Sequence, residues 1–289
     1  PNIPQKNGIK RAEEEAYALF LSDMHVGSKN FLEKDFNKFL KWINQELGNE
    51  TQKRIASKVK YIFILGDLVD GCGVYPGQEG ELNIKDIKDQ YRVCAEMLGK
   101  VPSHINLIIC PGNHDAMRVA EPQLPIYKDF AGPIYDLPNV IMVSNPSIIN
   151  IHSLHNFPGF DVLVYHGHSF DFYLSGVESI RNLGGYDRVD LLMKFLLKKR
   201  HLAPSYTSTL YVPDTSSDSL VIETVPDFFV TGHIHKSSVA NHKGVTLISG
   251  SCWQSKTAFQ EKVGHNPEPS RVPIVNLKTR HVKILKFGK

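Results

Sequence analysis

Short groups of Asp, Asn and His residues follow apolar runs at five places in this chain of 289 residues. Carboxylate, carboxamide and imidazole groups are ligands that divalent transition metals accept, and two such ions a few Å apart polarise phosphate esters. The groups are Asp23-Met24-His25, Gly66-Asp67-Leu68-Val69-Asp70, Gly112-Asn113-His114-Asp115, His166-Gly167-His168 and Gly232-His233-Ile234-His235. The sequence therefore predicts a dinuclear metal centre that hydrolyses phosphate esters.

The spacing inside two of the groups indicates how their side chains meet. Asp23 and His25 are two residues apart, so on an extended chain both side chains fall on the same side and can bind one ion. His233 and His235 repeat this spacing, and each can reach one of the metals. We therefore expect extended backbone at both pairs.

Asp67 is the candidate bridge between the two ions. It follows an apolar run and Gly66, which allows a tight approach to the metals. A carboxylate has two oxygens and can bridge ions roughly 3.5–4 Å apart. Asn113 and His166 would complete the set of ligands around the second ion. A lone Asp after a strand is more often a turn residue or a helix cap, but five such groups at strand ends are not expected by accident.

The hydrophobic pattern places the elements that must position these groups. Amphipathic spacing predicts helices through Phe36–Leu47, from about Ile84 to Leu98, and over Asp187–Lys199. Gly71–Gly80, Glu121–Pro138 and Tyr206–Asp218 are expected to be irregular. The predicted strands are Ala16–Leu21, Val59–Leu65, Ile105–Cys110, Val140–Val143, Ile148–Ile151, Val162–Tyr165, Phe228–Val230, Val245–Ile248, Val272–Leu277 and His281–Phe287. Strands that alternate with helices and then follow one another suggest an α/β fold of two sheets flanked by helices.

Composition narrows the class of protein. With 42% hydrophobic and 22% charged residues the chain has a globular composition, and no apolar run reaches the roughly 18 residues of a membrane span. The net charge of +3 does not by itself indicate nucleic acid. The four cysteines are scattered without a C-x-x-C pair, which favours a reducing, cytoplasmic location. Because the chain opens on Pro1, we expect it to be part of a longer protein.

From Asp23 to His235, the order of the five groups resembles the signature of the calcineurin-like metallophosphoesterases. The resemblance implies a two-sheet α/β sandwich over residues 17–289, with 171–224 partly an insertion over the site. The polar composition of residues 1–16 predicts a frayed lead-in before it. The resemblance also implies that His114 gives a proton to the leaving oxygen and that Asp115 helps to orient it. It assigns Asp23, His25, Asp67 and His235 to one metal, and Asp67, Asn113, His166 and His233 to the other.

A narrower resemblance is to the small subunit of archaeal family-D DNA polymerase, the proofreading 3′–5′ exonuclease. It is carried by Asp67-Leu68-Val69-Asp70-Gly71, Tyr75-Pro76-Gly77-Gln78-Glu79, Asn113-His114-Asp115, Arg118 and Ala120-Glu121-Pro122-Gln123. It implies a metal-dependent 3′–5′ exodeoxyribonuclease of an archaeal replicative polymerase, with two divalent ions, Mn²⁺ being the expected metal. The expected partners are single-stranded or mismatched 3′ ends of DNA and the large catalytic subunit, and no membrane.

Two other functions remain open at this stage. One is a phosphomonoesterase of the same fold, and the other is a non-catalytic scaffold like the eukaryotic B-subunits that have lost the ligands. The complete ligand set argues against a pure scaffold. The polymerase-type loop Gly71–Gly80 argues against a general phosphatase.

Overall fold

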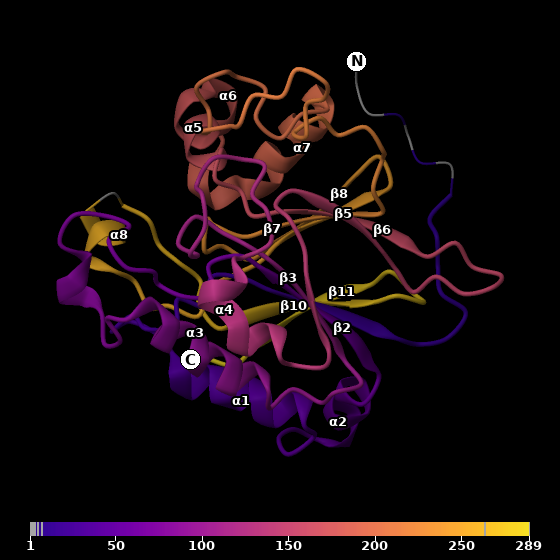
Figure 1. Cartoon of the computed structure of the whole chain (residues 1–289). Helices are drawn as coiled ribbons and strands as arrows, with labels where there is room; N and C mark the ends of the chain where they lie inside the picture. Colours follow the sequence, from indigo (N-terminus) through magenta and orange to yellow (C-terminus); the bar gives the residue numbers. More distant parts are fainter. Residues whose placement is uncertain (1–3, 5, 7, 263, 289) are drawn as a thin grey trace.

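Two β-sheets packed against each other form the centre of the computed structural model, which describes residues 4, 6, 8–262 and 264–288 (Figure 1). The first sheet has the order β11-β10-β1-β2-β3-β4, with β1 (Tyr17–Leu21), β2 (Val59–Leu65), β3 (Asn106–Cys110), β4 (Val140–Met142), β10 (Arg271–Asn276) and β11 (Val282–Lys286). The second has the order β5-β6-β7-β9-β8, with β5 (Ser147–Ile151), β6 (Phe160–Tyr165), β7 (Phe228–Thr231), β8 (Ser238–His242) and β9 (Val245–Ser249). The predicted two-sheet α/β sandwich is confirmed.

Helices lie outside both sheets (Figure 1). Beside the first sheet are α1 (Glu33–Ile43), α2 (Glu50–Ala56), α3 (Ile87–Leu98) and α4 (Lys128–Tyr135). Beside the second are α5 (Phe170–Gly176), α6 (Glu178–Arg181) and α7 (Val189–Lys199). The shorter elements are α8 (Ala258–Lys262) and the 3₁₀ turns η1 (Gln78–Glu81) and η2 (Gly185–Arg188).

Strand β2 illustrates why the central strands read as continuous apolar runs. Ile62 and Ile64 pack into the core between the first sheet and its helices, whereas Phe63 and Leu65 pack between the two sheets. Alternate side chains of a strand point to opposite faces, so a strand covered on both faces needs apolar residues at every position. The strand predicted at Val59–Leu65 has the same bounds in the structure.

Parallel pairing brings the ends of the central strands together. Strands β1, β2 and β3 are parallel neighbours, and so are β6, β7 and β9. Their carboxyl ends therefore meet at one edge of each sheet, which is where ligands bind in open α/β sheets. The Asp, Asn and His groups follow β1, β2, β3, β6 and β7.

The segment Glu121–Pro138 was expected to be irregular, and this prediction is wrong in its second half. Helix α4 lies there and contains Pro133, but its backbone is non-helical at Ala131. The break at Ala131 means that Pro133 does not interrupt a continuous ladder of helical hydrogen bonds. The proline is thus accommodated by a kink.

Several short elements were not predicted because they carry little hydrophobic pattern. Helix α2 buries only Ala56 and is defined instead by a capping box between Asn49 and Gln52. Strand β8 lies at the edge of its sheet and alternates between half-buried and exposed residues. The other missed elements are α5, α6 and α8.

The described part of the polar lead-in packs on the sandwich and is not frayed. Ala12 and Ala16 are buried, and the Ala12 N–H donates to the Leu277 carbonyl at 3.0 Å. The Lys10 ammonium lies 2.9 Å from the Asp227 carboxylate. Residues 10–16 therefore belong to the same packed unit as the sheets.

The segment 171–224, expected to be partly an insertion over the site, has two parts in the structure. Its start, with Asp171, borders the cavity described below. Helix α7 contacts β8 and β9 and packs against the second sheet. The start of the segment thus lies near the predicted ligands, whereas α7 covers the second sheet.

Two observations bear on the expectations from composition. Among the described residues, no helix combines the length and the apolar character needed to cross a membrane. All four cysteines are free thiols, and only Cys72 is exposed. Cys94 and Cys110 are buried within α3 and β3.

Candidate metal centre

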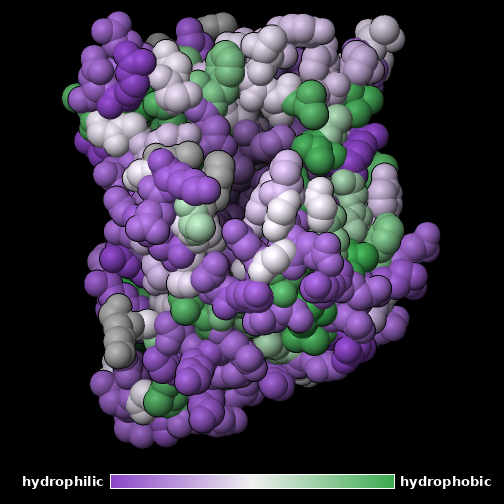
Figure 2. All heavy atoms as spheres, turned by 90° about the vertical axis from the view of Figure 1, so that its left-hand side faces the viewer, coloured by the Kyte–Doolittle hydropathy of each residue, from purple (hydrophilic) through white to green (hydrophobic). Residues whose placement is uncertain are grey.

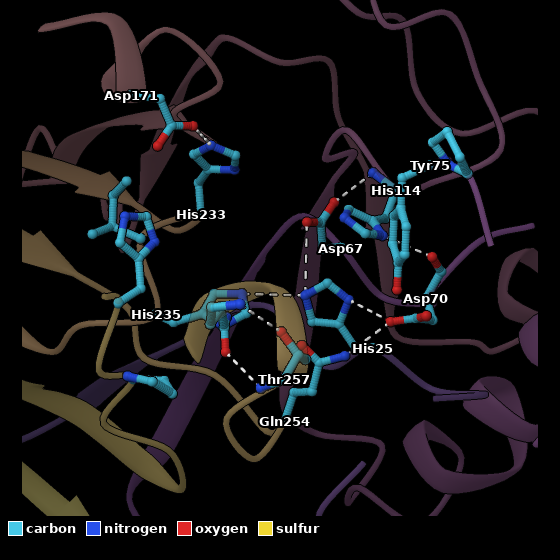
Figure 3. Close-up of a pocket in the computed structure, with 15 residues that line it drawn as sticks. His25, Asp67, Asp70, Tyr75, His114, Asp171, His233, His235, Gln254 and Thr257 are labelled. Carbon is cyan, nitrogen blue, oxygen red and sulfur yellow. Dashed lines mark hydrogen bonds and ion pairs between the residues drawn. The ribbon is translucent and has the colours of Figure 1, made fainter. Parts of the chain in front are cut away.

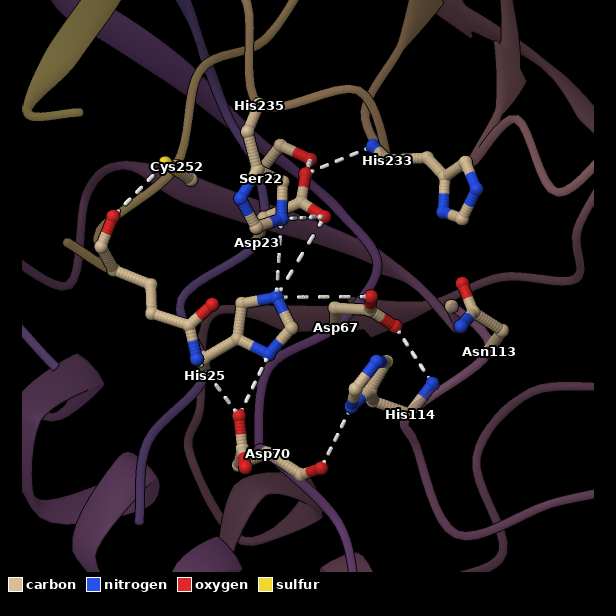
Figure 4. A network of polar contacts seen from close by, with 12 residues as sticks. Ser22, Asp23, His25, Asp67, Asp70, Asn113, His114, His233, His235 and Cys252 are labelled. Atoms are coloured by element: carbon tan, nitrogen blue, oxygen red, sulfur yellow. Dashed lines mark hydrogen bonds and ion pairs between the residues drawn. The ribbon is translucent and has the colours of Figure 1, made fainter. Parts of the chain in front are cut away.

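The loops that follow the central strands bring all seven predicted ligand residues to one place. All of them except His166 are labelled in Figure 4. In chain order the ligands follow β1 (Asp23 and His25), β2 (Asp67), β3 (Asn113), β6 (His166) and β7 (His233 and His235). Both sheets contribute ligands, so the centre lies where the two sheets meet. The ligands are far apart in sequence, and they come together because the strands that they follow are neighbours in the two packed sheets.

The backbone at these residues differs from the extended chain that the sequence suggested. Asp23, His25, Asp67, His233 and His235 have φ of 51°, 52°, 52°, 69° and 57°. This left-handed region is crowded for residues with a Cβ and is found mainly in tight turns and at functional sites. The side chains of Asp23 and His25, and those of His233 and His235, are therefore directed to the site by left-handed turns and not by the alternation of an extended strand.

One group of ligand atoms gathers around Asp23 Oδ1. His235 Nε2 lies 3.3 Å from it and His25 Nε2 lies 3.9 Å from it. The two imidazole Nε2 atoms are 3.2 Å apart. Two imidazole nitrogens and a carboxylate oxygen at these separations can surround one divalent ion.

A second group gathers on the other side of Asp67. Its Oδ2 lies 3.4 Å from His166 Nε2 and 3.9 Å from His25 Nε2 of the first group. The Asn113 Oδ1 lies 2.9 Å from His166 Nε2. Asp67, His166 and His233 have ligand atoms within 4.8 Å of one another. Asp67 thus borders both groups, as a bridging carboxylate would.

The surroundings of the ligands fit divalent ions. Metal-binding imidazoles have their second ring nitrogen held by a polar partner, which fixes the tautomer and the orientation of the ring. Three of the rings have an oxygen at the second nitrogen: the Asp70 carboxylate for His25 (3.1 Å), the Leu65 carbonyl for His166 (2.7 Å) and the Asp171 carboxylate for His233 (2.7 Å). At His235 it is the Gln260 side-chain nitrogen that lies 2.9 Å from Nδ1. Within the described part of the chain, the buried Asp23 Oδ1 accepts no hydrogen bond, which leaves this oxygen free for a cation.

The electrostatic field of the site favours positive charge. Burial by itself would raise the pKa of Asp67, but the charges of His166 and His114 and a hydrogen bond from His166 lower it well below its usual value. Burial would lower the pKa of His166, but the charge of Asp67 and a hydrogen bond to it raise that pKa to about 10. A site that keeps the buried Asp67 carboxylate ionised and attracts a proton onto the His166 imidazole also attracts metal cations.

Two glycines make the close approach of the loops possible. A Cβ on Gly112 would clash with the Asp67 carboxylate, and one on Gly66 would clash with the His166 ring. Gly66 also has a φ of 87°, which residues with a Cβ rarely adopt. The glycine before Asp67 thus serves the packing of His166 and the 112–115 loop.

His114 lies beside the two groups with one ring nitrogen engaged. Its Nδ1 is 2.7 Å from the Asp70 carbonyl, to which the Nδ1–H donates, so Nε2 is the nitrogen left for a ligand or substrate. Its backbone N–H donates to Asp67 Oδ1 at 2.8 Å. Its ring also lies near enough to His25 and Asp67 to form a third group of potential ligands.

Asp115 is buried on the inner side of the same loop. Its carboxylate accepts the Gly112 N–H at 2.9 Å and the Tyr91 hydroxyl at 3.0 Å. Burial, together with the charge of Asp67, raises the pKa of Asp115 to about 7. These contacts hold the 112–115 loop in place. Asp115 can therefore influence the position of His114 only through the backbone of this loop.

The centre opens into a cavity of about 390 Å³. This face of the molecule is hollowed, and mostly hydrophilic side chains surround the hollow (Figure 2). Tyr75 and Thr257 line this cavity (Figure 3), and so do Pro76, His265 and Pro267. The cavity therefore has metal ligands, His114 and an aromatic side chain within one space.

Four residues of this environment were not assigned a role from sequence. Asp70 contacts His25 Nδ1 and also accepts the Gln254 amide at 3.0 Å. Its position in the Gly66–Asp70 group was the one sequence feature that could have indicated a role for Asp70 at the site. Asp171 and Gln260 hold ligand imidazoles from elements remote in sequence. Nothing in the local sequence marks Asp171, Gln254 or Gln260.

Residues 18–240 match the family model for the B-subunits of DNA polymerase alpha/epsilon. The chain belongs to this family. Its predicted metal ligands are all present and lie in one place, with Asp67 shared between two groups.

Curated archaeal relatives carry the name DNA polymerase II small subunit. This chain is 44% identical to that of Pyrococcus abyssi over 290 residues, which is 100% of this chain and 45% of the relative. It is 40% identical to that of Methanothermobacter thermautotrophicus, over 100% of this chain and 57% of the relative. The chain thus spans about half the length of the curated relatives that it matches.

Solved structures with a similar shape include a protein described as a novel archaeal phosphodiesterase, with a TM-score of 0.45, 13% identity and coverage of 93% of this chain and 98% of that one. Another is Vps29 of Entamoeba histolytica in complex with zinc, with a TM-score of 0.39, 15% identity and coverage of 94% and 99%. At these levels neither resemblance bears on the activity of this chain.

Proposed function

We propose that this chain is the nuclease part of a proofreading subunit, a metal-dependent 3′–5′ exodeoxyribonuclease of an archaeal replicative DNA polymerase. The observation that carries the proposal is the complete ligand set, with Asp67 placed between two groups of ligands at a cavity. The archaeal relatives named as polymerase small subunits support the assignment to replication. The metal we propose is Mn²⁺.

The residues divide the work of hydrolysis between them. When bound, the two ions would polarise the phosphate ester and stabilise the charge that develops on its oxygens. One ion would be held by Asp23, His25, Asp67 and His235, and the other by Asp67, Asn113, His166 and His233. In its doubly protonated form, His114 would give the Nε2 proton to the departing 3′ oxygen and keep the Nδ1–H that donates to the Asp70 carbonyl.

The test is a gel assay with 5′-labelled DNA. Single-stranded, matched and mismatched primers are incubated with the chain, with and without Mn²⁺ and with and without the large subunit. We expect shortening from the 3′ end one nucleotide at a time, only with metal, and faster at mismatched ends. Loss of a terminal phosphate without shortening would favour a phosphomonoesterase. No cleavage at all by metal-loaded protein with the large subunit would favour a scaffold.

Tyr75 is expected to stack on a base of the substrate. Its ring lines the cavity 6.5 Å from the His114 ring, and its hydroxyl donates to Glu81 at 2.9 Å. Stacking contributes about 1–3 kcal/mol per base. Tyr75→Ala should therefore raise KM for oligonucleotides but not for a small aryl phosphodiester. Tyr75→Phe, which keeps the ring and loses the bond to Glu81, is the matched control. An equal loss on both substrates would indicate that Tyr75 only supports the loop.

The isolated chain is expected to bind DNA weakly and to depend on the large subunit. The formal net charge is only +3, and each phosphate contact requires Lys or Arg to release a counterion. A proofreading subunit receives its 3′ end from another active site, so its own affinity can be low. The affinity for DNA should be low for the chain alone and should fall only slowly as the salt concentration rises. It should be higher when the large subunit is present. Tight, steeply salt-dependent binding that the large subunit does not change would contradict the subunit assignment.

A further inference from the structure

Asp171 connects helix α5 to a ligand of the second ion. Its Oδ2 lies 2.7 Å from His233 Nε2 (Figure 3). Its Oδ1 accepts the Tyr186 hydroxyl at 2.8 Å. We propose that Asp171 is a positioning residue that fixes the His233 ring for the second ion, and that Tyr186 holds Asp171 in place. The proposal rests on the dinuclear centre of the proposed function.

The hydrogen bond decides which nitrogen of His233 can bind metal. A carboxylate oxygen at 2.7 Å requires a proton on Nε2, since a carboxylate only accepts hydrogen bonds. In the neutral ring the lone pair is then on Nδ1. Asp67 and His166, the other members of this group, have ligand atoms within 4.8 Å of a His233 nitrogen. Without Asp171, the ring could rotate or take the other tautomer, and the second ion would lose an oriented ligand.

Asp171 is itself held from two sides. The preceding residue, Phe170, is fully buried in the core under the second sheet, which fixes the start of α5. Tyr186, just before α7, bonds Asp171 and lies with its ring centroid 3.8 Å from that of His265, which lines the cavity. The segment 171–186 therefore contacts the predicted ligand His233 through the Asp171 carboxylate.

Because the Asp171 side chain is half exposed, its role in positioning His233 can be tested without disturbing the packing of the core. Half of its side chain is exposed, so removing the carboxylate leaves the core intact. Asp187 offers a matched control, because it directly follows Tyr186 and pairs with Lys236 of the loop that carries His233 and His235, at 2.6 Å. A general loosening of this segment should appear in both variants, whereas a positioning role should appear only at Asp171.

The experiment titrates Mn²⁺ into the metal-free chain by calorimetry. Wild type should bind two ions. Asp171→Asn and Asp171→Ala should weaken one of them by about 10–100-fold, as removal of such outer partners does, and leave the other unchanged. Tyr186→Phe should weaken the same ion by less, and Asp187→Asn should resemble wild type. Electron paramagnetic resonance gives a second readout, since a coupled Mn²⁺ pair should be replaced by single-ion signals in the Asp171 variants.

Two results would overturn the proposal. If the Asp171 variants are folded by circular dichroism and bind two ions as tightly as wild type, Asp171 does not position His233, and the proposed function stands. If wild type binds fewer than two ions, the dinuclear centre is wrong, and the proposed function falls together with this inference.

Discussion

Replacing Asp67 with alanine is expected to remove both metal ions and all phosphodiesterase activity. Asp67 Oδ2 lies 3.4 Å from His166 Nε2 and 3.9 Å from His25 Nε2, so the same oxygen borders both groups of ligands. Removing a shared ligand weakens two ions at once, whereas removing a ligand of one group should mainly weaken one. Elemental analysis of the purified protein after dialysis against metal-free buffer measures the result.

Asp23→Ala is the matched comparison, because Asp23 is equally buried but belongs to the first group alone. We expect it to retain about one equivalent of metal. Asp67→Asn keeps an oxygen that can accept the His114 N–H, a bond of 2.8 Å in the structure, and so separates metal loss from collapse of the loop. Two equivalents retained in a folded Asp67→Ala protein would show that Asp67 is not the bridge.

The sequence predicted the strand ends well because the relevant strands are buried on both faces. Val59–Leu65 is apolar at nearly every position, and the Asp67 group follows it directly. A buried strand must be apolar, and a polar group at its end marks where the chain leaves the core. The convergence of the groups then follows from parallel pairing within each sheet and from the packing of the two sheets against each other. For these reasons the sequence could predict both the sheets and the place where the candidate ligands gather.

The local geometry could not be predicted from spacing. An extended chain was expected at Asp23–His25, yet both residues are left-handed, with φ of 51° and 52°. Tertiary contacts impose this conformation: the Asp23 N–H donates to the Gly66 carbonyl and the His25 N–H to the Asp67 carbonyl, each at 3.1 Å. Such contacts join residues far apart in sequence and leave no local signal.

The supporting residues were missed for the same reason. Asp171 lies at the start of a short helix and Gln260 in α8, and each meets its imidazole only in the folded chain. A single Asp or Gln in a polar segment is indistinguishable from surface composition. Asp70 was missed as well, although it did have a local signal, since it lies three residues after Asp67 within one group.

Replacing His114 with alanine is expected to lower the rate of DNA hydrolysis by about 10²–10⁴-fold, the usual contribution of general acid catalysis, with metal content retained. His114 Nδ1–H is held by the Asp70 carbonyl at 2.7 Å, which leaves Nε2 to face a substrate in the cavity. The departing 3′ oxygen of DNA needs a proton, whereas the leaving group of an activated aryl phosphodiester does not. The loss should therefore be large on DNA and small on the aryl ester.

This dependence on the leaving group separates a proton donor from a metal ligand. His114 also lies near His25 and Asp67, in a group that could hold an ion. If it were a principal ligand, His114→Ala would lose metal and would slow both substrates alike. His104→Ala, at an exposed histidine before β3 and thus at the opposite end of that strand from Asn113, controls for loss of an imidazole. Added imidazole should restore part of the activity on DNA of His114→Ala. Metal content that falls in step with activity on both substrates would assign His114 to the metal centre instead.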